Sequence, residues 1–235
     1  MLNNLFEKIY LINLDRRKDR YEKFLKISEK YNLNFERISA FDGPLLLNND
    51  FAYGNKKISF IKNEFYKHEP GNFFGIENYH DRYFKGQVGC LISHLEILKL
   101  AQKNNYNSIL VLEDDVVFSD DFEQKVKNLY ENFPKEWDMF YLSGSLIKEG
   151  KKFNYYSELI STHTTHSYAV NSSAYKVLIK LLETNMFIKP VDSCYVSIQE
   201  SIKSFIAMPF LSYQESGFSD IHNSQASYDS IKNYL

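Results

Sequence analysis

The stretch SILVLEDDVVFSDDF, residues 108–122, joins an apolar run directly to three consecutive acids. SILVL is short and uninterrupted, which is the pattern of a β-strand buried on both faces of a parallel sheet. Glu113, Asp114 and Asp115 follow at the end of this strand. Adjacent carboxylates repel one another, and shielding them from water costs free energy. We therefore expect a positive group to lie next to these three acids.

The rest of the chain alternates between predicted strands and helices. KIYLINL (8–14) predicts a buried strand, residues 15–31 a helix with one apolar face, and FERISAFDG (35–43) a second strand. A β-α-β unit of this kind opens an α/β sheet. Further elements are expected as helices at 86–104, 119–133, 172–185 and 190–204 and strands at 108–112, 138–144, 163–171 and 205–214. We expect a single domain over residues 1–235.

Residues 44–86 break this alternation. They mix Asn, Gly and aromatic residues and show weak periodicity. A long irregular segment inside a compact domain is usually functional or mobile rather than part of the scaffold. We expect a variable insertion here.

The composition argues against several classes of protein. With 28 basic and 30 acidic residues the formal net charge is −2, so no overall positive field favours nucleic acid. Two cysteines, Cys90 and Cys194, are too few for a disulfide framework or a zinc set. No segment approaches the roughly 18 apolar residues of a membrane span, and the first residues lack the pattern of a signal peptide. We expect a soluble protein of a reducing compartment.

The position of the three acids favours a divalent cation. Ligands of open parallel sheets bind off the carboxyl ends of the strands. Mg²⁺ and Mn²⁺ take oxygen ligands there, commonly one or two carboxylates together with phosphate oxygens of a bound nucleotide. A solvated acidic turn, with Asp114 or Asp115 capping a short helix, is the structural alternative.

Two other segments place polar groups where a ligand could bind. INLDRRKDR puts Arg16 and Arg20 at the first strand-to-helix turn, where arginine suits phosphate or ribose. GQVGCLISH (86–94) has two glycines, which let backbone approach a ligand, ahead of Ser93 and His94. The structural alternatives are a surface helix start for the arginines and a packed or capping role for the histidine.

The C-terminal third adds two more candidates. Asp192 opens a predicted helix, where an N-cap is the common structural role. Asp220 and His222 lie in QESGFSDIHNS (214–224), which could equally be a flexible tail.

Taken in order, eight segments resemble glycosyltransferase family 25, namely YLINLDRRKDR, ISAFDG, GQVGCLISHLEILK, ILVLEDDVVF, WDMFYLSG, YAVNSSAYKVL, PVDSCYVSI and FLSYQESGFSDI. The most specific part is GCLISH followed by LEDD, and the resemblance covers the chain except residues 44–85. It implies a GT-A-type, Rossmann-like α/β fold with a mixed, mostly parallel central sheet flanked by helices. It also implies an inverting, metal-dependent transfer of a hexose, usually galactose from UDP-galactose, to a lipooligosaccharide or lipopolysaccharide core.

The resemblance suggests roles for individual residues. Asp115 would be the first ligand of Mn²⁺ or Mg²⁺, with Glu113 and His222 as further ligands. Asp220 is the alternative to His222, and Glu113 or Asp114 would touch the ribose or complete the metal shell through water. Asp192, which matches the family's Pro-Val-Asp, would be the base that takes the proton of the acceptor hydroxyl. The alternatives for this base are Asp220 and Glu200.

The UDP-sugar is expected to contact residues at several strand ends, namely Asn13, Arg16, Arg20, Ser93, His94, Glu113, Asp114 and Asp220. The 44–86 insertion is expected on the acceptor side, where Phe73 and Phe74 would stack on sugar rings. The expected partners are therefore a UDP-hexose and a saccharide of a glycolipid core, without nucleic acid. We expect the protein in the cytoplasm, either free or peripherally bound at the cytoplasmic face of the inner membrane.

Two other function classes remain open from the sequence. A metal-dependent nucleotidyl- or phosphotransferase would share the acids and arginines, although no G-x-x-x-x-G-K-[ST] loop is present. A cation-dependent sugar-binding module without catalytic activity would favour a loop such as D-x-[DN]-x-[DN]-G, and EDDVVFSDD lacks this spacing.

Overall fold

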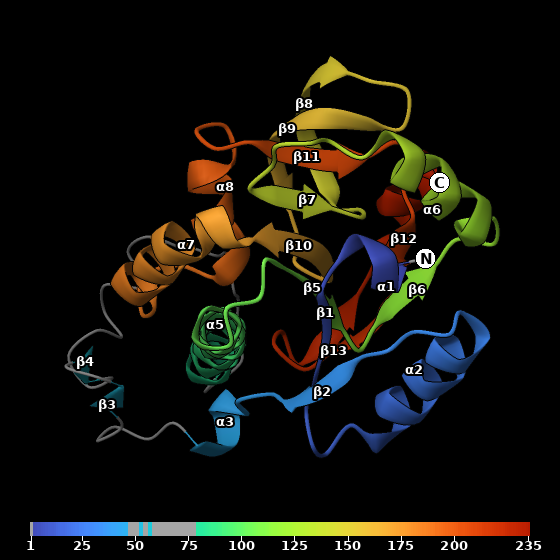
Figure 1. The fold of residues 1–235 in the computed structure, drawn as a ribbon. Coiled ribbons are helices and arrows are strands. Elements are labelled where there is room, and N and C mark those ends of the chain that lie inside the picture. The colour runs from blue at the N-terminus through green and yellow to red at the C-terminus, as the bar shows by residue number, and fades with distance from the viewer. Residues whose placement is uncertain (1, 47–51, 54–55, 58–78) are drawn as a thin grey trace.

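The computed structural model describes residues 2–46, 52–53, 56–57 and 79–235 (Figure 1). Eight strands form one sheet in the order β2-β1-β5-β10-β7-β11-β9-β8. Their bounds are β1 Lys8–Asn13, β2 Glu36–Ser39, β5 Ser108–Glu113, β7 Met139–Tyr141, β8 Ser145–Lys152, β9 Tyr156–His163, β10 Ser167–Asn171 and β11 Ser204–Ala207. Three small two-stranded sheets pair β12 Ser212–Gln214 with β6 Val116–Phe118, β13 Gly217–Ser219 with β14 Ser224–Ala226, and β3 Ala52–Tyr53 with β4 Lys56–Lys57.

Helices cover both faces of the large sheet (Figure 1). Their bounds are α1 Leu2–Leu5, α2 Lys18–Lys30, α3 Gly43–Leu46, α5 Tyr79–Lys103, α6 Phe122–Asn132, α7 Ser172–Asn185, α8 Val191–Gln199 and the 3₁₀-helix η2 Asp229–Tyr234. None of the helices in the described part of the chain combines the length and apolarity needed to cross a membrane.

The predicted mixed α/β sheet flanked by helices is confirmed, but its parallel share is smaller than expected. Three of the seven pairings are parallel, namely β1 with β2, β1 with β5, and β7 with β11, and the other four are antiparallel. The sequence did not reveal this because β10 is buried almost throughout and therefore has the same apolar pattern as a parallel strand. The parallel part, β2-β1-β5, is the part that carries the candidate site.

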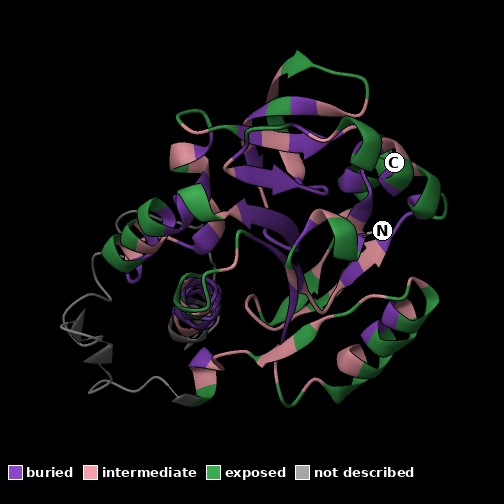
Figure 2. Ribbon diagram, in the orientation of Figure 1, coloured by how far each residue is buried: buried purple, intermediate pink, exposed green. Residues whose placement is uncertain are grey.

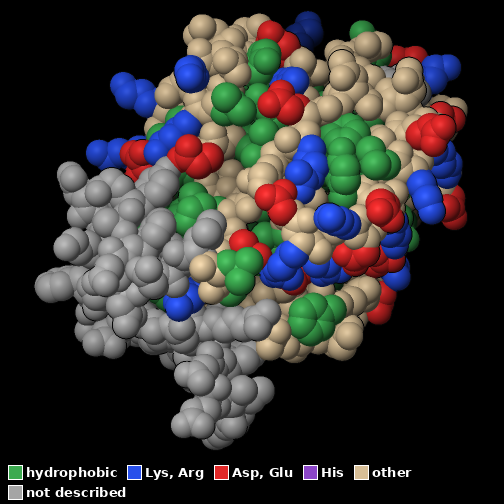
Figure 3. Space-filling view, turned by 90° about the horizontal axis from the view of Figure 1, so that it is seen from below, with side chains coloured by type: hydrophobic (Ala, Val, Ile, Leu, Met, Phe, Trp, Pro, Cys, Tyr) green, Lys and Arg blue, Asp and Glu red, His purple; other side chains and the backbone are tan. Residues whose placement is uncertain are grey.

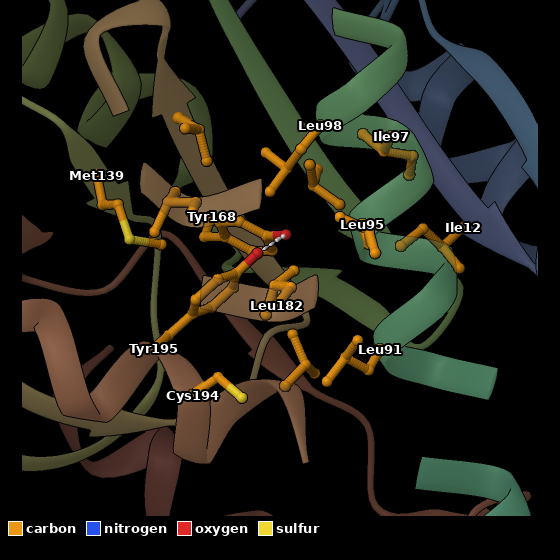
Figure 4. Packing of buried hydrophobic residues seen from close by; sticks show 14 of the residues in the cluster. Ile12, Leu91, Leu95, Ile97, Leu98, Met139, Tyr168, Leu182, Cys194 and Tyr195 are labelled. Carbon is orange, nitrogen blue, oxygen red and sulfur yellow. Dashed lines mark hydrogen bonds between the residues drawn. The ribbon is translucent and has the colours of Figure 1, made fainter. Parts of the chain in front are cut away.

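Alternating side chains of the central strands form two hydrophobic cores, one on each face. Tyr10 and Ile12 of β1 pack in the core beneath α5, α7 and α8. Ile9 and Leu11 pack in the other core, with α1, α2 and α6. Figure 2 shows the result, with buried strands at the centre and exposed outer faces on the helices. The first core also encloses Tyr195 of α8, close to α5 (Figure 4).

Within the 44–86 insertion, the structure describes the end of α3, the short strands β3 and β4 and the start of α5. Phe73 and Phe74, which we expected to contact the acceptor, lie outside the described residues. A single domain with an acceptor-side insertion therefore stays a prediction.

Helix α5 lies directly against the turn between β2 and α3. A Cβ atom on Gly89 would lie 2.5 Å from the carbonyl oxygen of Phe41 and 2.7 Å from the amide nitrogen of Gly43. One turn later, the Ser93 hydroxyl accepts a hydrogen bond from Phe41 N at 2.8 Å and donates one to Gly89 O at 2.8 Å. Gly89, considered above as a point of ligand approach, thus lets one part of the protein backbone approach another.

We predict that Gly89→Ala lowers the free energy of unfolding by about 1–3 kcal/mol, because α5 or the turn must move to admit the methyl group. Helix propensity alone would favour alanine by about 1 kcal/mol, so the sign of the change separates the two effects. Urea denaturation measures it. Gly217→Ala is the matched control, since its Cβ would meet nothing within 4 Å. A Gly89→Ala protein more stable than wild type would show that the contact is not tight.

Candidate functional site

The carboxyl ends of β1 and β5 meet at one edge of the sheet. Their parallel register sets Ile12 opposite Glu113, so the next residues, Asn13 and Asp114, are neighbours. Asn13 Nδ2 donates to Asp114 Oδ2 at 2.6 Å and to the carbonyl of Arg17 at 3.1 Å. Asn13 is 1% exposed and acts as a buried link between the acids and the first strand-to-helix turn.

Glu113 is fixed by two hydrogen-bond donors from other elements. Thr165 Oγ1 lies 2.7 Å and His94 Nε2 3.2 Å from Glu113 Oε1, and since a carboxylate only accepts, His94 donates through Nε2. Burial opposes the ionisation of Glu113, but these hydrogen bonds outweigh it and the pKa of Glu113 lies below its usual value. His94 Nδ1 lies 2.8 Å from the hydroxyl of Tyr168, which lies 3.1 Å from that of Tyr195 (Figure 4). His94 is buried and thus connects Glu113 to the core.

Arg20 supplies the positive charge that the sequence led us to expect. Its Nη1 lies 2.9 Å from Asp114 Oδ1 and 3.3 Å from Asp115 Oδ2. Burial raises the pKa of Asp114 in spite of Arg20. Burial and the charge of Glu113 raise the pKa of Asp115 further, to about 7, and Arg20 only partly opposes this. The acids are therefore incompletely neutralised by the protein.

Strand β12 brings a polar side chain to the same acids. β12 pairs with β6 so that Gln214 lies opposite Val116, and Glu215 N donates to the carbonyl of Asp115 at 2.9 Å. Gln214 Nε2 lies 3.2 Å from Asp115 Oδ2. Asp115 Oδ1 and Gln214 Oε1 are both buried, and neither has a hydrogen-bond partner among the residues that the structure describes. Two oxygens without donors in an acidic pocket fit the ligand preference of Mn²⁺ or Mg²⁺.

The first strand-to-helix turn is joined to the C-terminal segment by ion pairs. Arg16 and Arg17 each bind one carboxylate oxygen of Asp220, and Arg16 Nε lies 2.6 Å from Asp42 Oδ2. Burial opposes the ionisation of Asp220, but the two arginines hold its pKa below the usual value. Arg16 is therefore paired with two protein carboxylates.

A pocket opens among these groups, and every predicted site residue except Asp192 lines it, namely Asn13, Arg16, Arg20, Ser93, His94, Glu113, Asp114, Asp115, Asp220 and His222. The turn between β1 and α2 is at the bottom of Figure 1, and Figure 3 views the molecule from that side, where acidic and basic side chains lie interspersed. Segments far apart in the sequence thus converge on one pocket.

Three of the predicted residues are engaged within the protein or only partly accessible. The Ser93 hydroxyl is used by the turn at Phe41, and His94 reaches the pocket through Glu113. His222 lines the pocket, and burial lowers its pKa. The contacts of Ser93 and His94 with the UDP-sugar, and of His222 with the metal, therefore stay predictions.

Asp192 lies in the first turn of α8, outside the residues that line the pocket. Its Oδ1 accepts a hydrogen bond from Ser193 N at 2.7 Å, and its Oδ2 lies 3.4 Å from His163 Nδ1. Burial opposes ionisation, but His163 and backbone donors hold the pKa of Asp192 below its usual value. The negative charge of Asp192 acts to raise the pKa values of Cys90 and His222, both of which line the pocket.

A second possible metal group consists of Cys90, His94 and Glu113, whose ligand atoms lie within 4.8 Å of one another. Burial raises the pKa of the Cys90 thiol well above its usual value, so its thiolate is disfavoured. Glu113 Oε1 already accepts two hydrogen bonds. This group therefore matches the oxygen ligands of Mn²⁺ or Mg²⁺ less well than Asp115 does.

Sequence reasoning missed several residues of the site, among them Asp42, Thr165, Gln214 and Tyr228. Asp42 had a local signal, since it follows a predicted strand in FDG. The others are brought in by antiparallel strands and by the C-terminal segment, and nothing near them in the sequence marks them.

A family model described as glycosyltransferase family 25 (LPS biosynthesis protein) matches residues 6–195. The chain belongs to glycosyltransferase family 25. It is 27% identical over 157 residues to procollagen galactosyltransferase 2 of Mus musculus, covering 63% of this chain and 22% of that protein. It is 29% identical over 155 residues to inactive glycosyltransferase 25 family member 3 of Homo sapiens, covering 63% and 23%. The chain spans about a fifth of the length of these relatives.

A solved structure with a related arrangement is a glycosyltransferase involved in the glycosylation of the major capsid of PBCV-1. The match has a TM-score of 0.34 and 9% identity, and covers 86% of this chain and 91% of that one.

We predict a pH-dependent stability difference between wild type and Asp115→Asn in EDTA. The pKa of Asp115 is raised to about 7 in the folded protein, against about 3.9 in an unfolded chain. The protonated carboxyl therefore stabilises the fold fully below about pH 4, and this contribution is lost as the pH rises through about 7. Asparagine does not titrate, so the variant should gain on wild type over this range.

Urea denaturation at pH 5 and pH 8 measures the difference. At each pH, the free energy of unfolding of wild type is subtracted from that of the variant. This difference should be larger at pH 8 than at pH 5 by more than about 1 kcal/mol, since each pKa unit corresponds to about 1.4 kcal/mol. A difference that does not vary with pH would show that Asp115 is not destabilised by its neighbours.

Proposed function

We propose that this family 25 protein is an inverting, metal-dependent hexosyltransferase that uses a UDP-sugar. The observation that carries the proposal is the set Glu113-Asp114-Asp115, incompletely neutralised by Arg20, in a pocket that also holds Arg16. Such a pocket has acids for a cation and guanidinium groups for a diphosphate. A nucleotide-sugar needs both.

Asp115 would hold the cation, because its Oδ1 has no donor and its charge is the least neutralised of the three acids. When bound, Mn²⁺ or Mg²⁺ would act as a Lewis acid for the UDP leaving group. Glu113 and Asp114 would support this site, since His94, Thr165 and Asn13 hold their carboxylates in place.

Arg16 and Arg20 would contact the phosphates or ribose of the donor. Arg16 is paired with Asp42 and Asp220, and Arg20 with Asp114. To bind the donor, each arginine would leave a protein carboxylate and pair with a phosphate or ribose oxygen instead. A bound cation would favour this exchange, because its charge would neutralise the acids from which the arginines had moved away.

Asp192 is the proposed base for the acceptor hydroxyl. Its depressed pKa keeps it ionised at neutral pH, as a proton acceptor must be. The two alternatives are supported less well. Asp220 is neutralised by Arg16 and Arg17, and Glu200 is exposed at the end of α8.

The sugar and the acceptor are proposed from the comparisons. Galactose from UDP-galactose is supported by relatives whose names are procollagen galactosyltransferases. A sugar of a lipooligosaccharide or lipopolysaccharide core is supported by the description of the family as an LPS biosynthesis protein. A glycolipid acceptor would bring the protein to a membrane surface only through its substrate.

We predict that the protein releases UDP from UDP-galactose when Mn²⁺ and a lipooligosaccharide core acceptor are present. Asp115→Asn should lower the rate about 100-fold or more, since a Lewis acid contributes several kcal/mol at a leaving group. EDTA should have the same effect on wild type. A coupled assay for free UDP measures the rate, and mass spectrometry identifies the product.

The product and the variant test different parts of this proposal. A phosphorylated or nucleotidylated acceptor would contradict glycosyl transfer, and binding without turnover would favour a sugar-binding module. Near-wild-type transfer by Asp115→Asn, or full activity in EDTA, would contradict the cation site.

We predict that Asp192→Asn lowers the transfer rate by about 10²–10⁴, with UDP affinity unchanged and the protein still folded. Asparagine keeps a side-chain oxygen for Ser193 N, so a purely structural role would leave the rate intact. Glu200→Gln is the matched carboxyl-to-amide control and should be silent. Normal turnover by Asp192→Asn would move the base to another residue.

A further inference from the structure

The carboxamide oxygen of Gln214 is a buried acceptor that receives no hydrogen bond from the described part of the chain. Gln214 is 8% exposed and lines the pocket, and within residues 2–46, 52–53, 56–57 and 79–235 its Oε1 has no hydrogen-bond partner. Buried acceptors without a partner are few in folded proteins, and each calls for an explanation. Asp115 Oδ1, on the side chain that Gln214 contacts, is in the same situation.

The orientation of this carboxamide is set by its neighbour. Gln214 Nε2 donates to Asp115 Oδ2 at 3.2 Å, and turning the amide over would set its oxygen against a carboxylate oxygen. The backbone fixes the side chain as well, because β12 pairs Gln214 with Val116 and Glu215 N donates to Asp115 O at 2.9 Å. Gln214 Nε2 is thus engaged by Asp115, and Gln214 Oε1 remains available to a ligand in the pocket.

The charge of the surroundings indicates what that partner is. Arg20 reaches Asp115 at Oδ2 and not at the oxygen without a donor. Glu113 and Asp114 add two more carboxylates at the same strand end, so the site attracts a cation more strongly than a neutral hydroxyl. A carboxylate oxygen together with a carboxamide oxygen is a ligand set for a hard divalent cation.

We propose that Gln214 is a ligand of the divalent cation, binding through Oε1 together with Asp115 Oδ1. It takes the part that the sequence analysis gave to His222. The inference rests on the proposed function, in which Asp115 holds Mn²⁺. The C-terminal segment thereby contributes directly to the cation site, and the site depends on the pairing of β12 with β6.

Mn²⁺ titration followed by electron paramagnetic resonance tests this in the whole chain, with and without UDP. Gln214→Met removes both the oxygen and the N–H with little change in volume, and it should weaken Mn²⁺ binding about tenfold or more. Gln214→Glu keeps an oxygen but loses the N–H, and it should bind Mn²⁺ within about threefold of wild type. Gln225→Met is the matched control, since Gln225 is exposed on β14 and does not line the pocket.

The two variants separate a ligand from a hydrogen-bond donor. If both Gln214→Met and Gln214→Glu weaken binding equally, Gln214 serves only to hold Asp115 and the proposal is wrong. Unchanged Mn²⁺ affinity in Gln214→Met, with circular dichroism showing the native fold, would also overturn it. Loss of Mn²⁺ binding in Asp115→Asn but not in Gln214→Met would refute this inference alone. A wild-type protein that does not bind Mn²⁺ would refute the cation of the proposed function as well.

Discussion

The guanidinium of Arg20 joins three parts of the chain that lie far apart in the sequence. Through Nη1 it contacts Asp114 and Asp115 at the end of β5, and through Nη2 it donates to the carbonyl of Phe218 at 2.7 Å. The site depends on this interaction, because removing one partner of a buried ion pair leaves an uncompensated charge and costs about 3–5 kcal/mol. Arg20 thus holds the acids together while its single charge leaves them negative.

This residual negative charge explains the arrangement of the pocket. The arginines of the first strand-to-helix turn are paired with protein carboxylates, and Asp115 keeps an oxygen without a donor. A cation alone would neutralise only the acids, and a diphosphate alone would neutralise only the arginines. A cation and a diphosphate bound together neutralise the acids and the arginines, which is the combination that a sugar-nucleotide presents.

Much of the site could be predicted because its signals are local. The apolar run that ends at Glu113 and the arginines that follow β1 mark two carboxyl ends of adjacent parallel strands, and the register of β1 and β5 brings them together. Thr165 and Gln214 could not be found in this way. They reach the acids through the antiparallel pairings of β10 and β12, which link residues far apart in the sequence and leave no local pattern. For the same reason the direction of β10, and with it the parallel share of the sheet, was not evident.

The central claim is that the cation and the donor phosphates bind this pocket together. Isothermal titration calorimetry of UDP into the protein, with Mn²⁺ and again in EDTA, tests it most directly. UDP should bind about tenfold or more tightly with Mn²⁺, because the unneutralised acids otherwise repel the phosphates. Equal affinity for UDP in Mn²⁺ and in EDTA would contradict it.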